Sequence, residues 1–340
     1  MPPANGNTAE LVAFLKRRSA HPEAPRQVEV IETHFAWVFL TETHVRKLKK
    51  PVRNEVFDLS TRALRLAACR REFAINRALG GEVYEAVEPI TRNPDGDLAI
   101  GGSGEMVDAV LRMRRLPAGR ALDRPVQPSA YGRLAAAGQL LAGFYRTASL
   151  PPSALGDRPA AILAQLDTLR HRLEEGPLAL DAAVLAGLQA YAAGEAVRFT
   201  ARSEAAFVVD GHGDLRPEHV YLTTPPHVLD RLEFDPALRQ MDWQEDVALL
   251  AVDLEWQGRG WIGNALERSI AQQLGDDAPP ALWAFHKAWR ACLRARLCAD
   301  HRLRPGRFDA GFWVRRGRAY MDLARRHARS LDHGPKGHGC

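Results

Sequence analysis

The stretch that decides the fold reads VVDGHGDLRPEHVYL and occupies residues 208–222. It is a polar loop between two apolar ends whose composition is typical of β-strands. In the loop, Asp214 follows His212 by two residues, and His219 lies five residues after Asp214. Strands at both ends would hold these polar side chains in place, so we expect the loop to carry the chemistry of the protein.

A second carboxylate lies a short distance downstream. Residues 227–230 read HVLD, an apolar, strand-like segment that ends in Asp230. Kinase-type enzymes use one loop carboxylate to orient the attacking hydroxyl and another to hold the magnesium ion that bridges the ATP phosphates. The pattern gives the first role to Asp214 and the second to Asp230. The plainer alternative for Asp214 is an aspartate that caps the turn at residues 215–217.

These residues resemble the aminoglycoside phosphotransferase family, a small-molecule branch of the protein-kinase-like fold. The catalytic loop of that family reads His-Gly-Asp, four residues and Asn, whereas here HGD at 212–214 is followed at the Asn position by His219. The sequence DVALL at 246–250 looks like the family's next helix start. ETHFAWVFL at 32–40 and KLKKPV at 47–52 look like a bacterial subgroup of unassigned substrate. The resemblance spans roughly residues 27 to 260.

The resemblance implies an α+β, protein-kinase-like two-lobed fold, with a small antiparallel-sheet lobe that contains one long helix and a larger, mainly helical lobe. The hydrophobic pattern agrees with this expectation. Strand-like segments lie at 27–40, 44–48, 84–91 and 107–113, and a helical pattern at 59–79 ends at Gly80-Gly81. Helical patterns then occupy residues 129–148, 158–175, 180–200, 243–258, 279–303 and 309–330.

We therefore divide the chain into a loose N-terminal arm at residues 1–25, a nucleotide-binding lobe at 26–117, a helical lobe with the catalytic loop at 118–332, and a disordered Gly- and His-rich tail at 333–340. Members of the resembling subgroup sometimes carry a C-terminal P-loop ATP-binding domain. The sequence contains no Gly-x-x-x-x-Gly-Lys-Ser/Thr, so we expect no such domain in this chain.

The resemblance also implies an ATP site in the small lobe. Lys47 aligns with the lysine that contacts the ATP phosphates, and Glu72 on the following helix is its expected ion-pair partner. Lys49 is the alternative phosphate contact, because strand positions two apart point the same way. The plainer alternative for Glu72 is a surface side chain among arginines. The linker that starts at Met113 would offer backbone groups to adenine, and the first strands contain no Gly-x-Gly-x-x-Gly.

The metal site is where the sequence departs from the family. Magnesium favours oxygen ligands, whereas the imidazole of His219 suits transition metals. Either His219 contacts a phosphate or a water instead, or Glu233 and Asp235 supply the missing oxygen ligand near Asp230. By the resemblance, His212 packs and hydrogen-bonds inside the catalytic loop. Asp246 either caps the helix that follows it or anchors the backbone of the loop.

The composition predicts a cytoplasmic protein whose cysteines are reduced. The chain has 340 residues, is 46% hydrophobic, and has no apolar run long enough to span a membrane. Its four cysteines lack Cys-x-x-Cys spacing, which argues against disulfides and structural zinc. The net charge of +5 comes mainly from arginine, since only six lysines are present. Arginines between 294 and 329 would suit nucleic acid, but no nucleic-acid motif accompanies them.

The sequence thus predicts an enzyme: an ATP- and Mg²⁺-dependent phosphotransferase that acts on a hydroxyl group of a small molecule. Two alternatives remain open. His219 and the missing glycines suit a catalytically silent kinase-like protein that binds nucleotide or a protein partner. The arginine content suits a helical nucleic-acid-binding protein. Antibiotic resistance does not follow from the family name, because one fold serves many functions.

Overall fold

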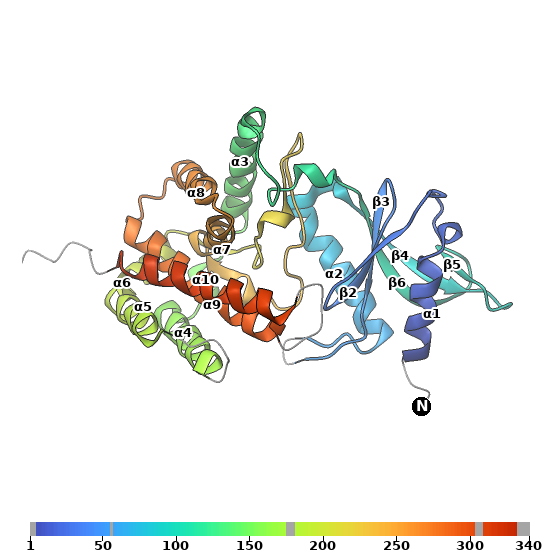
Figure 1. Ribbon diagram of the computed structural model, residues 1–340, viewed down its shortest axis with the longest axis horizontal. Coiled ribbons are helices and arrows are strands. Elements are labelled where there is room, and N and C mark those ends of the chain that lie inside the picture. The colour runs from blue at the N-terminus through green and yellow to red at the C-terminus, as the bar shows by residue number, and fades with distance from the viewer. Residues whose placement is uncertain (1–4, 55–56, 175–180, 303–308, 332–340) are drawn as a thin grey trace, which may run out of the picture. The chain divides into compact units, whose positions relative to one another are not determined.

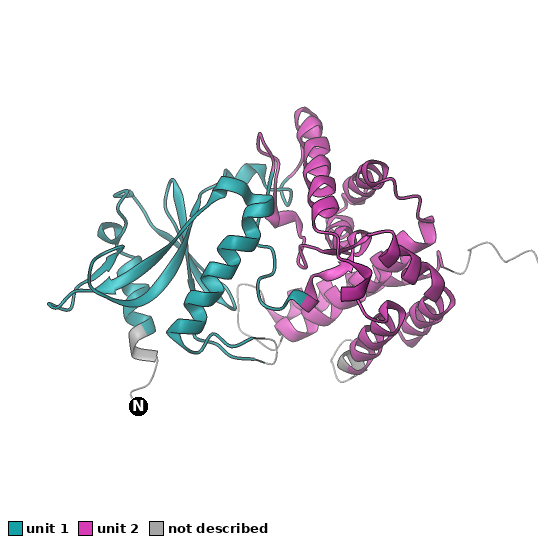
Figure 2. Cartoon of the chain, turned by 180° about the vertical axis from the view of Figure 1, so that it is seen from behind, with its two compact units in different colours: residues 1–124, 227–236 teal, residues 125–226, 237–340 magenta. Residues whose placement is uncertain are grey.

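The computed structural model describes residues 5–54, 57–174, 181–302 and 309–331. The chain divides into two compact units, coloured teal and magenta in Figure 2. Unit 1 contains residues 1–124 and 227–236, and unit 2 contains residues 125–226 and 237–340. The first unit therefore extends past the expected boundary at 117 and also takes in a later segment, which carries Asp230. The tail at 333–340 lies outside the described residues.

Unit 1 is built on a six-stranded antiparallel sheet with the strand order β1-β2-β3-β6-β4-β5 (Figure 1). Its elements are β1 Glu29–Glu32, β2 Ala36–Leu40, β3 His44–Lys49, α2 Arg62–Gly80, β4 Tyr84–Arg92, β5 Leu98–Ile100, β6 Glu105–Arg114 and β9 His227–Val228. The single strand expected at 27–40 is two strands. A turn separates them, in which the hydroxyl of Thr33 both donates to the carbonyl of Ala36 and accepts from its N–H.

The expectation of a loose N-terminal arm is wrong for residues 5–15. They form helix α1 (Asn5–Leu15), which packs on the sheet. Leu11 and Leu15 are 2% and 0% exposed and share a core with Phe39 and Leu48 of the sheet. One turn of apolar residues among Pro and Asn looked too short to fold alone. It is the sheet that provides the burial it needs.

Helix α2 ends at the predicted Gly80-Gly81, but it starts at Arg62 rather than at residue 59. The hydroxyl of Thr61 accepts the N–H of Leu64, which caps the first turn. At the other end, Gly81 has φ of 54° and its N–H reaches the carbonyl of Arg77. The helix therefore holds Glu72 in a fixed, fully buried place against the sheet.

Unit 2 is mainly helical. It contains α3 Tyr131–Thr147, α4 Arg158–Glu174, α5 Ala182–Gly194, α6 Ala196–Glu204, β7 Val208–Asp210, β8 Val220–Tyr221, β10 Gln240–Asp242, α7 Trp243–Trp256, α8 Gly260–Leu274, α9 Pro280–Arg302 and α10 Ala310–Ala328. The helix expected at 180–200 is two helices, and α8 was not expected. In α8, a Cβ at Gly263 would come within 2.6 Å of Ala251, so the glycine permits close packing of α8 on α7.

The antiparallel sheet of unit 1 and the helices of unit 2 confirm the expected α+β class. In the described part of the chain, every helix is too short or too polar to cross a membrane.

Candidate active site

Unit 1 brings together two lysines and three carboxylates, which we call the lysine cluster: Lys47, Lys49, Glu72, Asp230 and Glu233. The two oxygens of Glu72 accept separate bonds, from Lys47 Nζ at 2.8 Å and from Lys49 Nζ at 2.6 Å. Lys47 Nζ also lies 2.6 Å from Asp230 Oδ1, and Lys49 Nζ lies 2.6 Å from Glu233 Oε1. The predicted ion pair of Lys47 with Glu72 is present, and Lys49 lies on the same strand face as expected.

Burial makes this cluster strongly ionic. Burial alone would lower the pKa of both lysines, but the carboxylates outweigh it and raise each pKa above its usual value. Burial likewise favours a higher pKa for Glu72, yet Lys47 and Lys49 hold that pKa below its usual range. The pKa of Glu233 is raised, first by burial and then by the nearby charge of Glu72. Lys47 and Glu72 therefore stay charged at neutral pH.

The two lysines are not equivalent. The side chain of Lys49 is only 3% exposed and its two partners are buried as well. The side chain of Lys47 is 16% exposed, and its partner Asp230 is 44% exposed. A phosphate group arriving from solvent would meet Lys47 and Asp230 first. The geometry thus favours Lys47 over Lys49 as the phosphate contact.

The backbone of Asp230 is held in an uncommon conformation. Its φ is 64°, a left-handed value that costs free energy in a residue other than glycine. The N–H of Asp230 donates to the hydroxyl of Tyr84 at 2.9 Å. The side-chain amide of Asn76 accepts the N–H of Arg231 at 2.7 Å and donates to its carbonyl at 3.2 Å. Contacts from β4 and α2 thus set where the Asp230 carboxylate points.

Unit 2 holds the loop for which the sequence predicts a catalytic role, residues 211–219 after β7, and we keep the name catalytic loop for it. Asp246 in the first turn of α7 accepts the N–H of His212 at 2.6 Å and the N–H of Gly213 at 3.0 Å. The hydroxyl of Tyr145 donates to the same carboxylate at 3.0 Å. Of the two roles expected for Asp246, the loop anchor is confirmed. The cap role is wrong, because Asp242 caps α7 by accepting the N–H of Gln244.

The two histidines of the loop stabilise its backbone conformation. The His212 ring is completely buried and its Nδ1 accepts the N–H of Asp214 at 3.3 Å. The His219 ring stacks on it with 5.8 Å between centroids, and its Nδ1 lies 2.9 Å from the carbonyl of Asp214. Since a carbonyl only accepts, Nδ1 of His219 is the donor. The structural role predicted for His212 agrees with this geometry.

Two arginines near Asp214 were missed by sequence reasoning. Burial would lower the pKa of Arg216 and Arg294, but carboxylates that include Asp214 raise both. Buried Asp253 of α7 accepts from Arg294 Nε at 2.9 Å and lies 3.5 Å from Arg216 Nε. The sequence contained no signal for Arg216, and it favoured a solvated helical face for Arg294, which the packing of α9 on α7 places inside unit 2 instead.

The metal ligands and the adenine contact remain predictions. Asp230 fits a hard cation for two reasons. The lysine cluster has three carboxylates but only two lysines, and the carboxylate of Asp230 is the most exposed of the three. Glu233 is 6% exposed and already paired with Lys49, so it fits a structural role better. Among the residues that the structure describes, no group of three or more His, Cys, Asp or Glu side chains is arranged as a metal site. Met113 lies inside β6, paired with Val45 and Tyr84, rather than in the linker.

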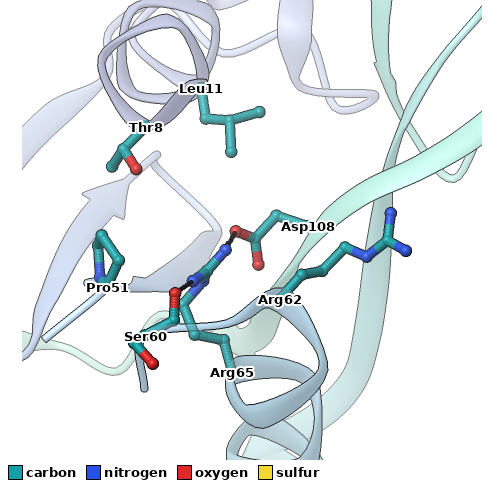
Figure 3. A pocket seen from close by; sticks show the side chains of 7 residues that line it. All are labelled: Thr8, Leu11, Pro51, Ser60, Arg62, Arg65 and Asp108. Atoms are coloured by element: carbon teal, nitrogen blue, oxygen red, sulfur yellow. Dashed lines mark hydrogen bonds and ion pairs between the residues drawn. The ribbon is translucent and has the colours of Figure 1, made fainter. Parts of the chain in front are cut away.

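A small cavity of about 190 Å³ lies elsewhere in unit 1, at the start of α2 (Figure 3). Its main polar side chain, Arg65, is buried and bonds to Asp108 at 2.7 Å and to the backbone carbonyls of Leu59 and Ser60. These bonds join α2 to β6 and leave the guanidinium well satisfied. We assign the cavity a structural role.

The fold is similar to that of kinase and phosphotransferase structures. The chain superposes on a choline kinase from Cryptosporidium parvum Iowa II with a TM-score of 0.53 and 9% identity, covering 96% of each chain. A GDP complex of a mutant aminoglycoside 2′-phosphotransferase-IIIa gives a TM-score of 0.52 and 15% identity, covering 95% of this chain and 98% of the other. The chain has the protein-kinase-like fold of these proteins, which confirms the resemblance predicted from the sequence at the level of the fold.

In sequence, the chain is similar to uncharacterized proteins of Mycobacterium tuberculosis strain H37Rv and Mycobacterium bovis. Each is 32% identical over 292 residues, which are 82% of this chain and 56% of the relative. The chain therefore spans little more than half the length of these relatives. No protein-family model matches the chain.

Proposed function

We propose that this chain is an ATP-dependent phosphotransferase of the aminoglycoside phosphotransferase family that acts on a hydroxyl group of a small molecule. One observation carries the proposal: Lys47 contacts both Glu72 and Asp230, from segments 25 and 183 residues away in the sequence. Phosphoryl transfer needs charge placed around the transferred group and an oriented hydroxyl more than covalent help. Lys47, which lies between Glu72 of α2 and Asp230, supplies such a charge.

Each of this chain's groups then has a role. Lys47 binds the phosphates of ATP, while Glu72 keeps the ammonium group charged and in place. Asp230 would hold Mg²⁺, which neutralises phosphate oxygens when it is bound. Asp214 accepts a hydrogen bond from the acceptor hydroxyl and orients its oxygen for attack, and Asp246 keeps the loop in shape for this. Binding of nucleotide and metal replaces the contact between Lys47 and Asp230.

The test is Mg²⁺-dependent ATP turnover, measured as ADP release with a panel of hydroxyl-bearing metabolites. We expect Asp214→Asn and Asp230→Asn each to lower the rate by at least about 100-fold. Asp300→Asn is the matched control, because that carboxylate is 53% exposed on α9. Far-UV circular dichroism establishes that all variants fold. Equal turnover in the wild type and the two active-site variants would refute the proposal.

A second candidate rests on His219, which replaces the family's Asn with a poor ligand for magnesium. On this alternative the chain binds nucleotide without turning it over. ATP would then raise the melting temperature, while no acceptor would elicit ADP release. The variant His219→Asn separates the two: turnover that appears only in the variant favours the silent alternative, and turnover in both favours the enzyme.

A further inference from the structure

Unit 2 contains a cavity of about 360 Å³ to which the catalytic loop contributes no residue. Helices α4, α7 and α9 line it together with the start of β10. Gln240 of β10 is the register partner of Asp210, the residue just before the catalytic loop. The volume lies within the range of small-molecule pockets.

One part of the wall is apolar. Leu169, Met241 and Trp289 are nearly buried, at 2%, 4% and 8% exposure, and present their side chains to the cavity. Leu238 is also part of the wall and is 44% exposed, which is unusual for a leucine. A ligand with an apolar body would remove this surface from water, which stabilises binding by about 25 cal/mol per Å².

The acidic residue in the wall, Glu245, is already paired with two arginines. Glu245 Oε1 accepts from Trp289 Nε1 at 2.9 Å and lies 3.0 Å from Arg290 Nη2. Its other oxygen lies 3.2 Å from Arg158 Nη2. Burial favours a higher pKa for Glu245, but Arg290 and Arg158 outweigh it and lower that pKa. The carboxylate thus stays ionised between two guanidinium groups and offers little attraction to a cationic ligand.

Arg296 is the remaining charge in the wall. Its Nη2 donates to Asp300 at 3.3 Å, and that aspartate is 53% exposed, so the pair is weak. Its Nε is buried and lacks a hydrogen-bond partner among the described residues. A buried donor without a partner destabilises the folded state, because it has lost its hydrogen bonds to water. A ligand oxygen that draws the guanidinium toward the cavity would recover this free energy.

From this wall we infer that the cavity is a binding site for a small amphipathic carboxylate, whose apolar body lies against Trp289 and Met241 and whose carboxylate pairs with Arg296. A guanidinium group matches a carboxylate with two parallel hydrogen bonds. The site needs neither nucleotide nor metal. It therefore stands or falls separately from the proposed phosphotransferase activity.

The experiment is isothermal titration calorimetry of the nucleotide-free full chain with three probes of equal chain length: octanoate, octanol and octylammonium. We expect octanoate to bind at least about 10-fold more tightly than octylammonium, a difference of about 1.4 kcal/mol. Arg296→Gln should lower the affinity for octanoate about 10-fold and leave that for octanol unchanged. Arg318→Gln is the matched control, because that arginine is exposed on α10 and lies outside the cavity wall.

A second variant tests the place of binding. Thr168 is exposed and lines the cavity, so Thr168→Trp fills it without disturbing the core. This variant should weaken both octanoate and octanol. The inference is overturned if octylammonium binds as tightly as octanoate, if Arg296→Gln leaves octanoate binding unchanged, or if Thr168→Trp does.

Discussion

Unit 1 and unit 2 each present one aspartate with a proposed role in phosphoryl transfer, and they hold it by opposite means. The carboxylate of Asp230 is held by charge, 2.6 Å from Lys47. The carboxylate of Asp214 has no hydrogen bond or ion pair among the described residues. Its loop is instead held through the backbone, because Asp246 accepts two N–H groups and His219 contacts the carbonyl of Asp214.

The proposed roles of the two carboxylates account for this difference. A group that binds a cation during the reaction can be paired with another cation beforehand, because one charge replaces the other. A group that accepts a hydrogen bond from an acceptor hydroxyl has to keep its lone pairs available, so its position has to come from the backbone. Breaking the two supports should therefore have different consequences for stability and for activity.

The largest effect is expected from Glu72→Ala in the lysine cluster. It removes a carboxylate shared by two lysines and leaves Lys49 buried with one partner. Loss of one member of a buried ion pair costs about 3–5 kcal/mol, which urea denaturation measures directly. Glu105→Ala is the matched control, since the Glu105 side chain is 83% exposed and should change stability by less than about 0.5 kcal/mol. A loss below about 1 kcal/mol for Glu72→Ala would show that charge does not hold this site.

A somewhat smaller effect is expected from Asp246→Ala in unit 2. The variant leaves the N–H groups of His212 and Gly213 and the hydroxyl of Tyr145 without their acceptor. We expect a loss of about 2–4 kcal/mol, again from urea denaturation, because unsatisfied buried donors are costly. Tyr145→Phe removes just one of the three bonds and should cost about 1 kcal/mol. Equal losses in the two variants would mean that the loop is held elsewhere.

How much of this the sequence could predict differs between the two supports. Family spacing predicted the ion pair of Lys47 with Glu72, and one of two readings of Asp246 was correct. The contact of Lys49 with Glu233 was not predicted, because the two residues lie 184 positions apart in the sequence and the chain between them turns at Asp230 with a positive φ. That conformation depends on Tyr84 and Asn76, which are far away in the sequence and carry no local signal.

The same limit explains the missed helices. Leu11 and Leu15 of α1 gain their burial from the sheet, and Gly263 lets α8 pack closely on α7, where Ala251 leaves no space for a side chain. Propensity and periodicity describe a segment by itself, whereas these segments are decided by their neighbours. The catalytic loop was easier because its polar residues and flanking strands lie within one stretch of sequence.

A third prediction concerns the backbone support that unit 1 does have. Asn76→Ala removes the acceptor for the N–H of Arg231 and the donor to its carbonyl. We expect a loss of about 1–3 kcal/mol in urea denaturation, less than for Glu72→Ala, since no charge is left unpaired. Asn76→Asp is the informative partner, because it retains an acceptor but not the donor and adds a charge beside Asp230. A loss as large as that of Glu72→Ala would contradict the view that charge dominates in unit 1.

The smallest effect is expected on β3, on the face opposite to Lys47. There Arg46 Nη1 contacts Glu23 at 2.6 Å, and the Glu23 side chain is 18% exposed. Burial favours a higher pKa for Glu23, but Arg46 and the hydroxyl of Thr41 outweigh it and hold the pKa at about 2 instead of 4.5. A lowered pKa stabilises the folded state above the unfolded value, so the contribution is complete above pH 4.5 and is lost as the pH falls toward about 2. We expect Glu23→Gln to cost about 1 kcal/mol at neutral pH, after allowance for solvent screening.

Urea denaturation of the wild type and of Glu23→Gln as a function of pH should show that the gap between their free energies of unfolding closes below pH 4.5. A gap that stays constant down to the lowest pH would mean that Glu23 contributes through packing rather than charge.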